Sequence, residues 1–309
     1  MVQDPRRIAV IGTGTVGASW AAYYLARGFE VLATDPGPGA EDALRSRVAQ
    51  AWPALEQLGL DAGASQDHLH FVADVPAALD GATWVQESAP EREELKIELL
   101  QIIDEHCPAE VVIASSSSGL LISRISSAMA HPERCVIGHP FNPPHLMPLV
   151  EVVGGQATSP ETVQAALSFY RSIGKRPIHV KREVVGHVAN RIQAAIFREA
   201  LHLLHEDVVS VADLDDAVLY GPGIRLALMG PFMTFHLAGG PGGMEHFLEH
   251  LTDAYNTWFA DLGNPFLTPG DAALILQGIE EEVAGRPMEE LVARRDVSLV
   301  KLLSTIEQL

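Results

Sequence analysis

The sequence predicts an α/β fold, a doubly wound and mostly parallel sheet, followed by an all-helical C-terminal domain. Three observations lead to this prediction. Short apolar runs alternate with helical patterns in the first half of the chain, a glycine-rich turn follows the first of these runs, and no confident strand pattern occurs after about residue 186. A length of 309 residues suits two domains, and we place them at residues 1–185 and 186–309.

The apolar runs of the first half are short, as expected of strands that are buried on both faces. In chain order, the expected strands are 7–11, 30–34, 70–72, 83–87, 111–115, 134–138, 147–153 and 176–180. The main helical patterns among them are 16–27, 40–58, 91–106 and 160–172. Because strands alternate with helices, we expect a parallel sheet with helices on both faces. Beyond it, helices are expected at 187–206, 211–218, 229–237 and 244–259, and as a C-terminal pair.

The composition restricts the possible partners. The net charge of −19 argues against nucleic acid and anionic membrane surfaces. The two cysteines, Cys107 and Cys135, are too few for a disulfide framework and lack the spacing of a metal site. We therefore expect a cytoplasmic protein without a bound metal. The first residues do not have the pattern of a signal peptide, and no apolar stretch has the length of a membrane span.

The first predicted strand runs directly into the sequence Gly12-Thr13-Gly14-Thr15-Val16-Gly17, which opens the first predicted helix. A GxGxxG pattern at such a junction is typical of dinucleotide binding in a Rossmann-type domain. Gly12 allows the tight turn, Gly14 lets the backbone approach a pyrophosphate, and Gly17 lets the helix pack closely on the strand. Thr15 and Val16 belong to the helix N-terminus, whose free N–H groups attract phosphate charge.

Asp35 follows the second predicted strand, eighteen residues after Gly17. A carboxylate at this position can accept hydrogen bonds from the ribose hydroxyls of NAD, whereas it would repel the 2′-phosphate of NADP. No arginine takes its place, so we expect NAD as the cofactor. The pattern leaves two alternatives open: a glycine turn with an ordinary helix-capping aspartate, and FAD, whose binding proteins share the fingerprint.

Polar side chains that suit proton transfer follow the sixth predicted strand. Oxidation of a hydroxyl to a ketone needs a base for the hydroxyl proton, and histidine titrates in the suitable range. His139 stands at this position. The base in turn needs a carboxylate to orient it. Glu151 lies in the apolar run PLVEVV, where a carboxylate without a partner would be costly, so we expect it to pair with His139.

Four serines, residues 115–118, end the fifth predicted strand. The carboxyl ends of the strands face the ligand crevice in a doubly wound sheet. The hydroxyls can therefore bond a substrate oxygen, or they form a serine-rich turn that caps the next helix. Asn142 is a further donor, or else a turn residue before Pro143 and Pro144.

The order of these features resembles the 3-hydroxyacyl-CoA dehydrogenase family over nearly the whole chain. The matching landmarks are the glycine turn, ESAPE at 87–91 followed by Lys96, the serine run, HPFNPP at 139–144 with a glutamate twelve residues after its histidine, GHVANR at 186–191 and MGPF at 229–232. The resemblance implies His139 as the catalytic acid/base and Glu151 as its partner. It implies that Ser118 and Asn142 bind the substrate oxygen.

The resemblance also implies positions around the cofactor. It places Asn190 near the substrate and the nicotinamide, and it places Glu91, Lys96 and Ser118 near NAD. Without the resemblance, Glu91 and Lys96 would be expected on a solvated, charged helix face. It further implies a homodimer formed through the helical domain, although the apolar helices could equally bury themselves within one chain.

Several segments are similar to one branch of the family, that of carnitine 3-dehydrogenase and L-gulonate 3-dehydrogenase (lambda-crystallin), which act on free 3-hydroxy acids. Examples are DPGPGA at 35–40, PLVEVV at 148–153 and GPFMTFHLAGG at 230–240. Arg225 can clamp a substrate carboxylate; its alternative is a salt bridge on the surface or between subunits. Aromatic faces such as Tyr220 suit a trimethylammonium group. At position 145, where these enzymes tend to have tyrosine, the chain has His145.

We therefore predict an NAD-dependent dehydrogenase that oxidises the 3-hydroxyl of a small free hydroxy acid, similar to carnitine or gulonate, with a His–Glu dyad as acid/base. One alternative is a short-chain 3-hydroxyacyl-CoA dehydrogenase. The second is a non-catalytic, crystallin-like protein that binds NAD.

Overall fold

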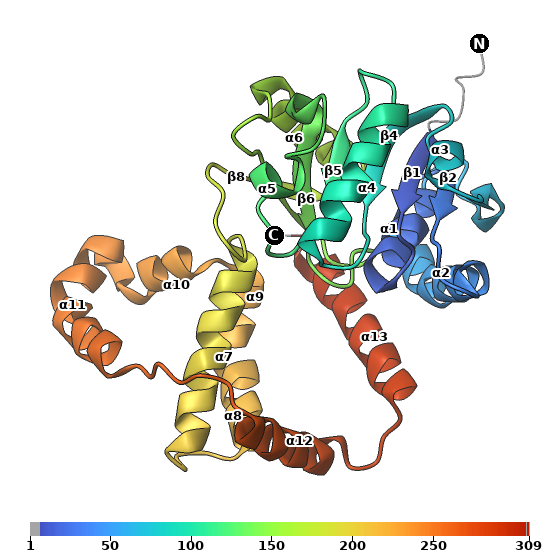
Figure 1. Ribbon diagram of the computed structural model, residues 1–309. Helices are drawn as coiled ribbons and strands as arrows, with labels where there is room; N and C mark the ends of the chain where they lie inside the picture. The colour runs from blue at the N-terminus through green and yellow to red at the C-terminus, as the bar shows by residue number, and fades with distance from the viewer. Residues whose placement is uncertain (1–6, 307, 309) are drawn as a thin grey trace. The chain divides into compact units, whose positions relative to one another are not determined.

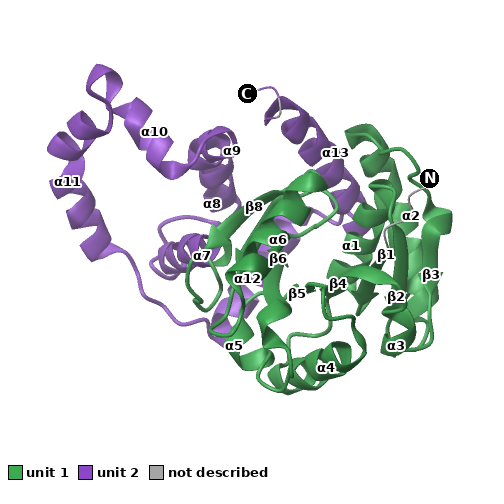
Figure 2. Ribbon diagram, turned by 90° about the horizontal axis from the view of Figure 1, so that it is seen from above, with its two compact units in different colours: residues 1–190 green, residues 191–309 purple. Residues whose placement is uncertain are grey.

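The structure is a computed structural model that describes residues 7–306 and residue 308. The chain divides into two compact units, unit 1 with residues 1–190 and unit 2 with residues 191–309 (Figure 2). The division falls five residues beyond the expected boundary at 185, within the long helix α7 (Ala189–His205).

Unit 1 is built on one eight-stranded sheet. The strands are β1 (Arg7–Ile11), β2 (Glu30–Thr34), β3 (Leu69–Phe71), β4 (Ala82–Glu87), β5 (Ile113–Ser115), β6 (Cys135–Pro140), β7 (Leu149–Val153) and β8 (Arg176–Val180), and their order is β3-β2-β1-β4-β5-β6-β7-β8. All neighbours are parallel except β6 and β7, which run antiparallel. The predicted class, a Rossmann-type mostly parallel sheet followed by a helical domain, is confirmed.

Helices cover both faces of this sheet (Figure 1). One face packs against α1 (Thr15–Ala26), α2 (Ala40–Leu58) and α6 (Pro160–Ser172), and the other against α3 (Val75–Ala78), α4 (Glu93–His106) and α5 (Ile122–Ile125). Side chains alternate between the two cores along β1: Ile8 and Val10 belong to the first, Ala9 and Ile11 to the second. Burial on both faces explains why these strands are apolar without interruption.

An aromatic cluster holds β4 against α1 and α6. Trp20 and Tyr24 stack with ring centroids 5.2 Å apart, and Trp20 also stacks on Tyr170 at 5.7 Å. The hydroxyls of Tyr24 and Tyr170 both donate to Oε1 of buried Gln86, at 3.0 and 2.9 Å. The buried amide oxygen of Gln86 is therefore satisfied, and these bonds fix the end of β4 beside the candidate site.

Unit 2 is helical. After α7 it comprises α8 (Val211–Val218), a π-helical turn (Leu219–Gly223), α9 (Ile224–Leu228), α10 (Pro231–Ala238), α11 (Gly243–Asp261), α12 (Pro269–Val283) and α13 (Met288–Ile306). Phe235 of α10 stacks on Phe247 of α11 with centroids 4.8 Å apart. The backbone N–H of Gly263 donates to Glu199 at 2.8 Å, which ties the end of α11 to α7. Among the described helices, none is long and apolar enough to cross a membrane.

Candidate active site

The glycine turn between β1 and α1 is dictated by close packing at two of its three glycines. Gly12 has φ +90°, and a Cβ there would lie 2.7 Å from the amide nitrogen of Ala89. A Cβ on Gly17 would lie 1.9 Å from the carbonyl oxygen of Gly12. Beside Gly14, by contrast, an added Cβ would meet nothing within 4 Å. A ligand therefore has room to approach the backbone closely at Gly14, as the GxGxxG pattern requires.

The surroundings of this turn suit a dinucleotide. The carboxylate of Asp35, directly after β2, accepts hydrogen bonds from the backbone N–H of Thr13 at 2.7 Å and of Gly37 at 2.8 Å. The N-cap of α1, Gly14, has no side-chain cap, and the first turn, which includes Thr15 and Val16, carries no acid. The N–H groups at the start of α1 are therefore free to bind phosphate.

Lys96 is fully buried, with 1% of its surface exposed, so the expectation of a solvated helix face is wrong for it. Its ammonium group donates to Oε1 of Glu87 at 2.6 Å and to the carbonyl oxygen of Ala89 at 3.1 Å. The other oxygen of Glu87 accepts from Ser115. Sequence reasoning missed Glu87 as a site residue. The signal was available, because an acid ends the buried strand β4 at the carboxyl edge of the sheet.

Glu91 organises the serine turn. Its Oε1 accepts from the hydroxyl of Ser117 at 2.7 Å and from the backbone N–H groups of Ser118 and Gly119, both at 2.9 Å. Burial alone would raise the pKa of Glu91, but these bonds and the Lys96 ammonium outweigh it and hold the pKa below its ordinary value. Glu91 is therefore an anionic centre that holds the turn in place.

The four serines have different roles in this geometry. Ser115 donates to Glu87, Ser116 accepts from Gln86 at 2.8 Å, and Ser117 donates to Glu91. Ser118 is exposed, and its hydroxyl has no hydrogen-bond partner among residues 7–306. Of the four hydroxyls, that of Ser118 is the one available to a bound molecule.

His139 and Glu151 are paired across adjacent strands. The antiparallel register of β6 and β7 places them directly opposite each other, and Nδ1 of His139 lies 2.9 Å from Oε2 of Glu151. Both side chains are buried. A carboxylate accepts and cannot donate, so Nδ1 carries the proton and Nε2 of His139 has the free lone pair. The sequence predicted the end of this strand at 138; pairing with β7 extends it to Pro140 and brings His139 into the ladder.

The second oxygen of Glu151 is also engaged. Oε1 accepts from the backbone N–H groups of Val188 at 2.8 Å and Ala189 at 3.0 Å, at the start of α7. Burial would raise the pKa of Glu151, but the bonds from His139 and from these two amides outweigh it and lower the pKa below its ordinary value. The residue is therefore ionised at neutral pH and can stabilise a positive charge on His139.

His187 was not singled out by sequence reasoning, although it lies in the GHVANR segment at 186–191. Its ring is 5.2 Å from the ring of His139, its Nε2 lies 3.0 Å from the carbonyl oxygen of Ser117, and its φ is +50°. Burial, together with the charge of His139, lowers the pKa of His187 despite that hydrogen bond. A neutral imidazole therefore joins the serine turn to the segment that holds Glu151. Non-glycine residues with such a φ are uncommon and concentrate at functional sites.

The other predicted residues of unit 1 differ in their burial and in their hydrogen bonds. The amide of Asn190 donates to the carbonyl oxygen of Ser118 at 3.2 Å, so these two residues lie together. Asn142 is exposed, two residues beyond the end of β6. His145 is buried against α1, where its Nδ1 lies 2.7 Å from Oγ of Ser19, and its backbone N–H donates to the same oxygen.

Arg225 lies on α9 in unit 2, and its side chain is exposed. Its guanidinium group has no hydrogen bond and no ion pair to another described residue of unit 2. The π-helical turn before it is kinked at Gly221.

Two family models account for most of the chain. The model described as 3-hydroxyacyl-CoA dehydrogenase, NAD binding domain, matches residues 7–184, and that of the C-terminal domain matches residues 186–264. The chain belongs to the 3-hydroxyacyl-CoA dehydrogenase family. The resemblance predicted from the sequence is confirmed, and so is NAD as the cofactor.

Within the 3-hydroxyacyl-CoA dehydrogenase family, the chain is similar to proteins named L-carnitine dehydrogenase. That of Streptomyces griseus is 48% identical and covers 97% of this chain and 90% of its own. That of Pseudomonas putida is 44% identical over 99% of this chain and 95% of its own. A solved structure of 5-formyl-3-hydroxy-2-methylpyridine 4-carboxylic acid 5-dehydrogenase, described as an NAD-dependent dismutase, has a TM-score of 0.84 at 32% identity, covering 98% of this chain and 99% of its own. The chain is thus an NAD-dependent oxidoreductase that acts on CH–OH groups.

Proposed function

We propose that this enzyme oxidises the 3-hydroxyl of a small, free hydroxy acid of the carnitine type, with His139 as the acid/base. The observation that carries the substrate class is the 44–48% identity to L-carnitine dehydrogenases over nearly the full length. The observation that carries the mechanism is the 2.9 Å contact between His139 and Glu151 inside a buried strand pair. The buried pair of His139 and Glu151 also argues against a non-catalytic, crystallin-like role.

In this proposal Nε2 of His139 takes the proton of the substrate hydroxyl. Glu151 holds the ring through Nδ1, keeps Nε2 unprotonated at the start of the reaction and stabilises the imidazolium that forms. Because Glu151 is ionised and buried, its negative charge acts through little solvent and its effect on the imidazolium is strong. In the reverse reaction the same nitrogen returns the proton to the keto oxygen.

The substrate oxygen is held by Ser118 and Asn142 in this proposal. The hydroxyl of Ser118 is free to donate, and both side chains are exposed. Asn190 and Glu91 position Ser118 through bonds to its carbonyl oxygen and its N–H group. A donor aimed at the reacting oxygen stabilises the negative charge that develops on it.

The glycine turn and Asp35 would hold NAD, and Glu91 and Lys96 would lie near it. When bound, NAD accepts the hydride of the carbinol carbon. The chain contributes the open space at Gly14, the uncapped start of α1 and the carboxylate of Asp35 for the ribose hydroxyls. A charged network holds the ends of β4 and β5 in place beside the glycine turn. It consists of Glu87, Lys96 and Glu91.

Recognition of a free acid falls to Arg225 in this proposal. A guanidinium group without a protein partner can bind a carboxylate through two parallel hydrogen bonds. Tyr220, five residues earlier and 71% exposed, offers an aromatic face to a quaternary ammonium group. Carnitine carries a free carboxylate and a quaternary ammonium group. A 3-hydroxyacyl-CoA has a thioester in place of the free carboxylate and no quaternary ammonium group on its acyl chain.

A substrate panel tests the proposal. We expect L-carnitine to reduce NAD, measured by the absorbance of NADH, and L-gulonate to reduce it more slowly. We expect no NAD reduction with 3-hydroxybutyryl-CoA. Arg225→Met should raise KM for the free acid by roughly ten- to a hundredfold, which corresponds to the loss of a charged hydrogen bond of about 1.5–3 kcal/mol, and should change kcat less.

Arg294→Met is the matched control, because Arg294 is an exposed arginine on α13. Its KM should stay within about twofold of wild type. Strict dependence on the thioester would favour the 3-hydroxyacyl-CoA alternative, and an Arg225→Met variant that behaves like Arg294→Met would refute the carboxylate clamp.

We also propose that the enzyme is a cytoplasmic homodimer assembled through unit 2. Of 31 large apolar side chains that are exposed in the described chain, 26 lie in unit 2, among them Phe232 at 80%, Phe259 at 63% and Phe266 at 84%. So much exposed apolar surface is unusual for a monomer. Light scattering at micromolar concentration should give twice the 33.3 kDa chain mass; a monomer mass would contradict the assembly. Cys107 and Cys135 are free thiols, which supports the cytoplasm as the compartment, because thiols stay reduced there.

A further inference from the structure

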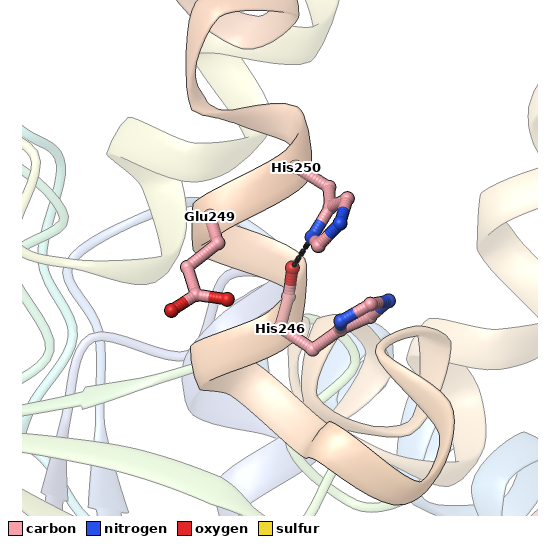
Figure 3. A group of neighbouring side chains, drawn as sticks. All are labelled: His246, Glu249 and His250. Atoms are coloured by element: carbon pink, nitrogen blue, oxygen red, sulfur yellow. Dashed lines mark hydrogen bonds between the residues drawn. The ribbon is translucent and has the colours of Figure 1, made fainter.

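Helix α11 carries three potential metal ligands on adjoining positions of one side. His246, Glu249 and His250 are separated by three and four residues, the spacing at which helical side chains become neighbours. Figure 3 shows them on consecutive turns of the helix. None of them belongs to the candidate active site, and no metal was expected from the amino-acid sequence.

The geometry favours chelation. One ligand atom from each side chain lies within 4.8 Å of the others, and the two imidazole rings have centroids 4.0 Å apart at an interplanar angle of 39°. Nδ1 of His250 lies 2.9 Å from the backbone carbonyl oxygen of His246, to which it donates (Figure 3). That bond fixes the tautomer of His250 with a lone pair on Nε2. Metal-bound histidines are typically oriented by a hydrogen bond of this kind from their second nitrogen.

The charge around α11 also favours a cation. No lysine or arginine occurs between Arg225 and Arg286, whereas Glu245 and Asp253 lie on the same helix. In the described part of the chain, no cationic side chain pairs with Glu249. A metal ion would therefore not have to displace an existing ion pair.

We propose that His246, Glu249 and His250 bind one divalent transition-metal ion of the zinc and copper class. Imidazole nitrogens suit these ions, while calcium and magnesium prefer oxygen ligands. The three protein ligands leave further coordination positions to water. Because the chelate joins two consecutive turns, the bound ion stabilises the start of α11, where the helix has only Gly242 as its N-cap and no side-chain cap.

The test uses the full-length enzyme without a polyhistidine tag, titrated with zinc chloride by calorimetry. We expect one saturable site per chain and a rise in the unfolding temperature with zinc. His246→Gln and His250→Gln should each weaken binding by at least about tenfold, given that losing even an outer partner of a ligand costs 10- to 100-fold. Glu249→Gln should weaken it less. Copper(II) should give an electron paramagnetic resonance spectrum with two coupled nitrogens.

His106 supplies a matched control. It is exposed on α4, and its Nδ1 lies 2.9 Å from the carbonyl oxygen of Ile102, the same intrahelical bond as in His250, but it has no histidine one turn away. His106→Gln should leave zinc affinity unchanged. Zinc affinity that is equally insensitive to His246→Gln and His250→Gln, or equal competition by magnesium, would overturn the proposal.

Discussion

Replacing His139 with glutamine should lower kcat by about a hundred- to ten-thousandfold, the usual contribution of a positioned acid/base. Glutamine preserves polarity at the end of β6 but cannot take the hydroxyl proton. Binding of NADH, measured by its fluorescence, should stay within about threefold of wild type, because the glycine turn and Asp35 lie on other strands. The loss should therefore appear in kcat and not in cofactor affinity.

Two comparisons make this result decisive. Glu151→Gln should also lower kcat, because it removes the charge that keeps His139 in its productive tautomer and stabilises the imidazolium. His106→Gln, on the surface of α4, should keep wild-type kcat. A His139→Gln enzyme that retains more than a tenth of wild-type kcat would show that another group transfers the proton.

Replacing Lys96 with methionine should destabilise unit 1 by about 3–5 kcal/mol, the usual cost of removing one partner of a buried ion pair. Lys96 and Glu87 are 1% and 0% exposed, and their charged atoms are 2.6 Å apart. Methionine fills a similar volume but leaves the carboxylate of Glu87 without its counter-charge. Urea unfolding followed by tryptophan fluorescence measures the effect, since Trp20, Trp52 and Trp84 all lie in unit 1.

An exposed ion pair is the control for Lys96. Arg45 and Glu41 form such a pair on α2, and Arg45→Met should cost less than about 1 kcal/mol. The double variant Lys96→Met/Glu87→Gln should recover part of the lost stability, because it removes the uncompensated charge. Equal losses for Lys96→Met and Arg45→Met would mean that burial adds nothing to the Lys96 interaction.

The elements and the cofactor turn were predictable from the sequence because their signals are local. Strand–helix alternation predicted all eight strands of unit 1 within a few residues, and Gly12, Gly14 and Gly17 marked the junction between β1 and α1 that we propose binds the dinucleotide. The pairing of His139 with Glu151 was predictable for a different reason. A carboxylate in an apolar strand needs a partner, and a suitable one lay twelve residues away.

Other features depend on contacts that no local pattern contains. Lys96 lies in an amphipathic, charged segment, which normally predicts exposure, yet Glu87 and the carbonyl oxygen of Ala89 draw it into the interior. The antiparallel register of β6 and β7 could not be predicted, because it depends on the path of the chain between the two strands. His187 was hidden for the same reason, because its contacts to Ser117 and His139 span long stretches of chain.

The two carboxylate oxygens of Glu151 bond two different segments of unit 1. One oxygen bonds the ring of His139 on β6, and the other accepts from the amides of Val188 and Ala189 at the start of α7. A displacement of the start of α7 must break two bonds to Oε1 and would leave that oxygen unsolvated. Glu151 therefore links the position of the start of α7 to the orientation of the His139 ring, so that one carboxylate couples these two segments of unit 1.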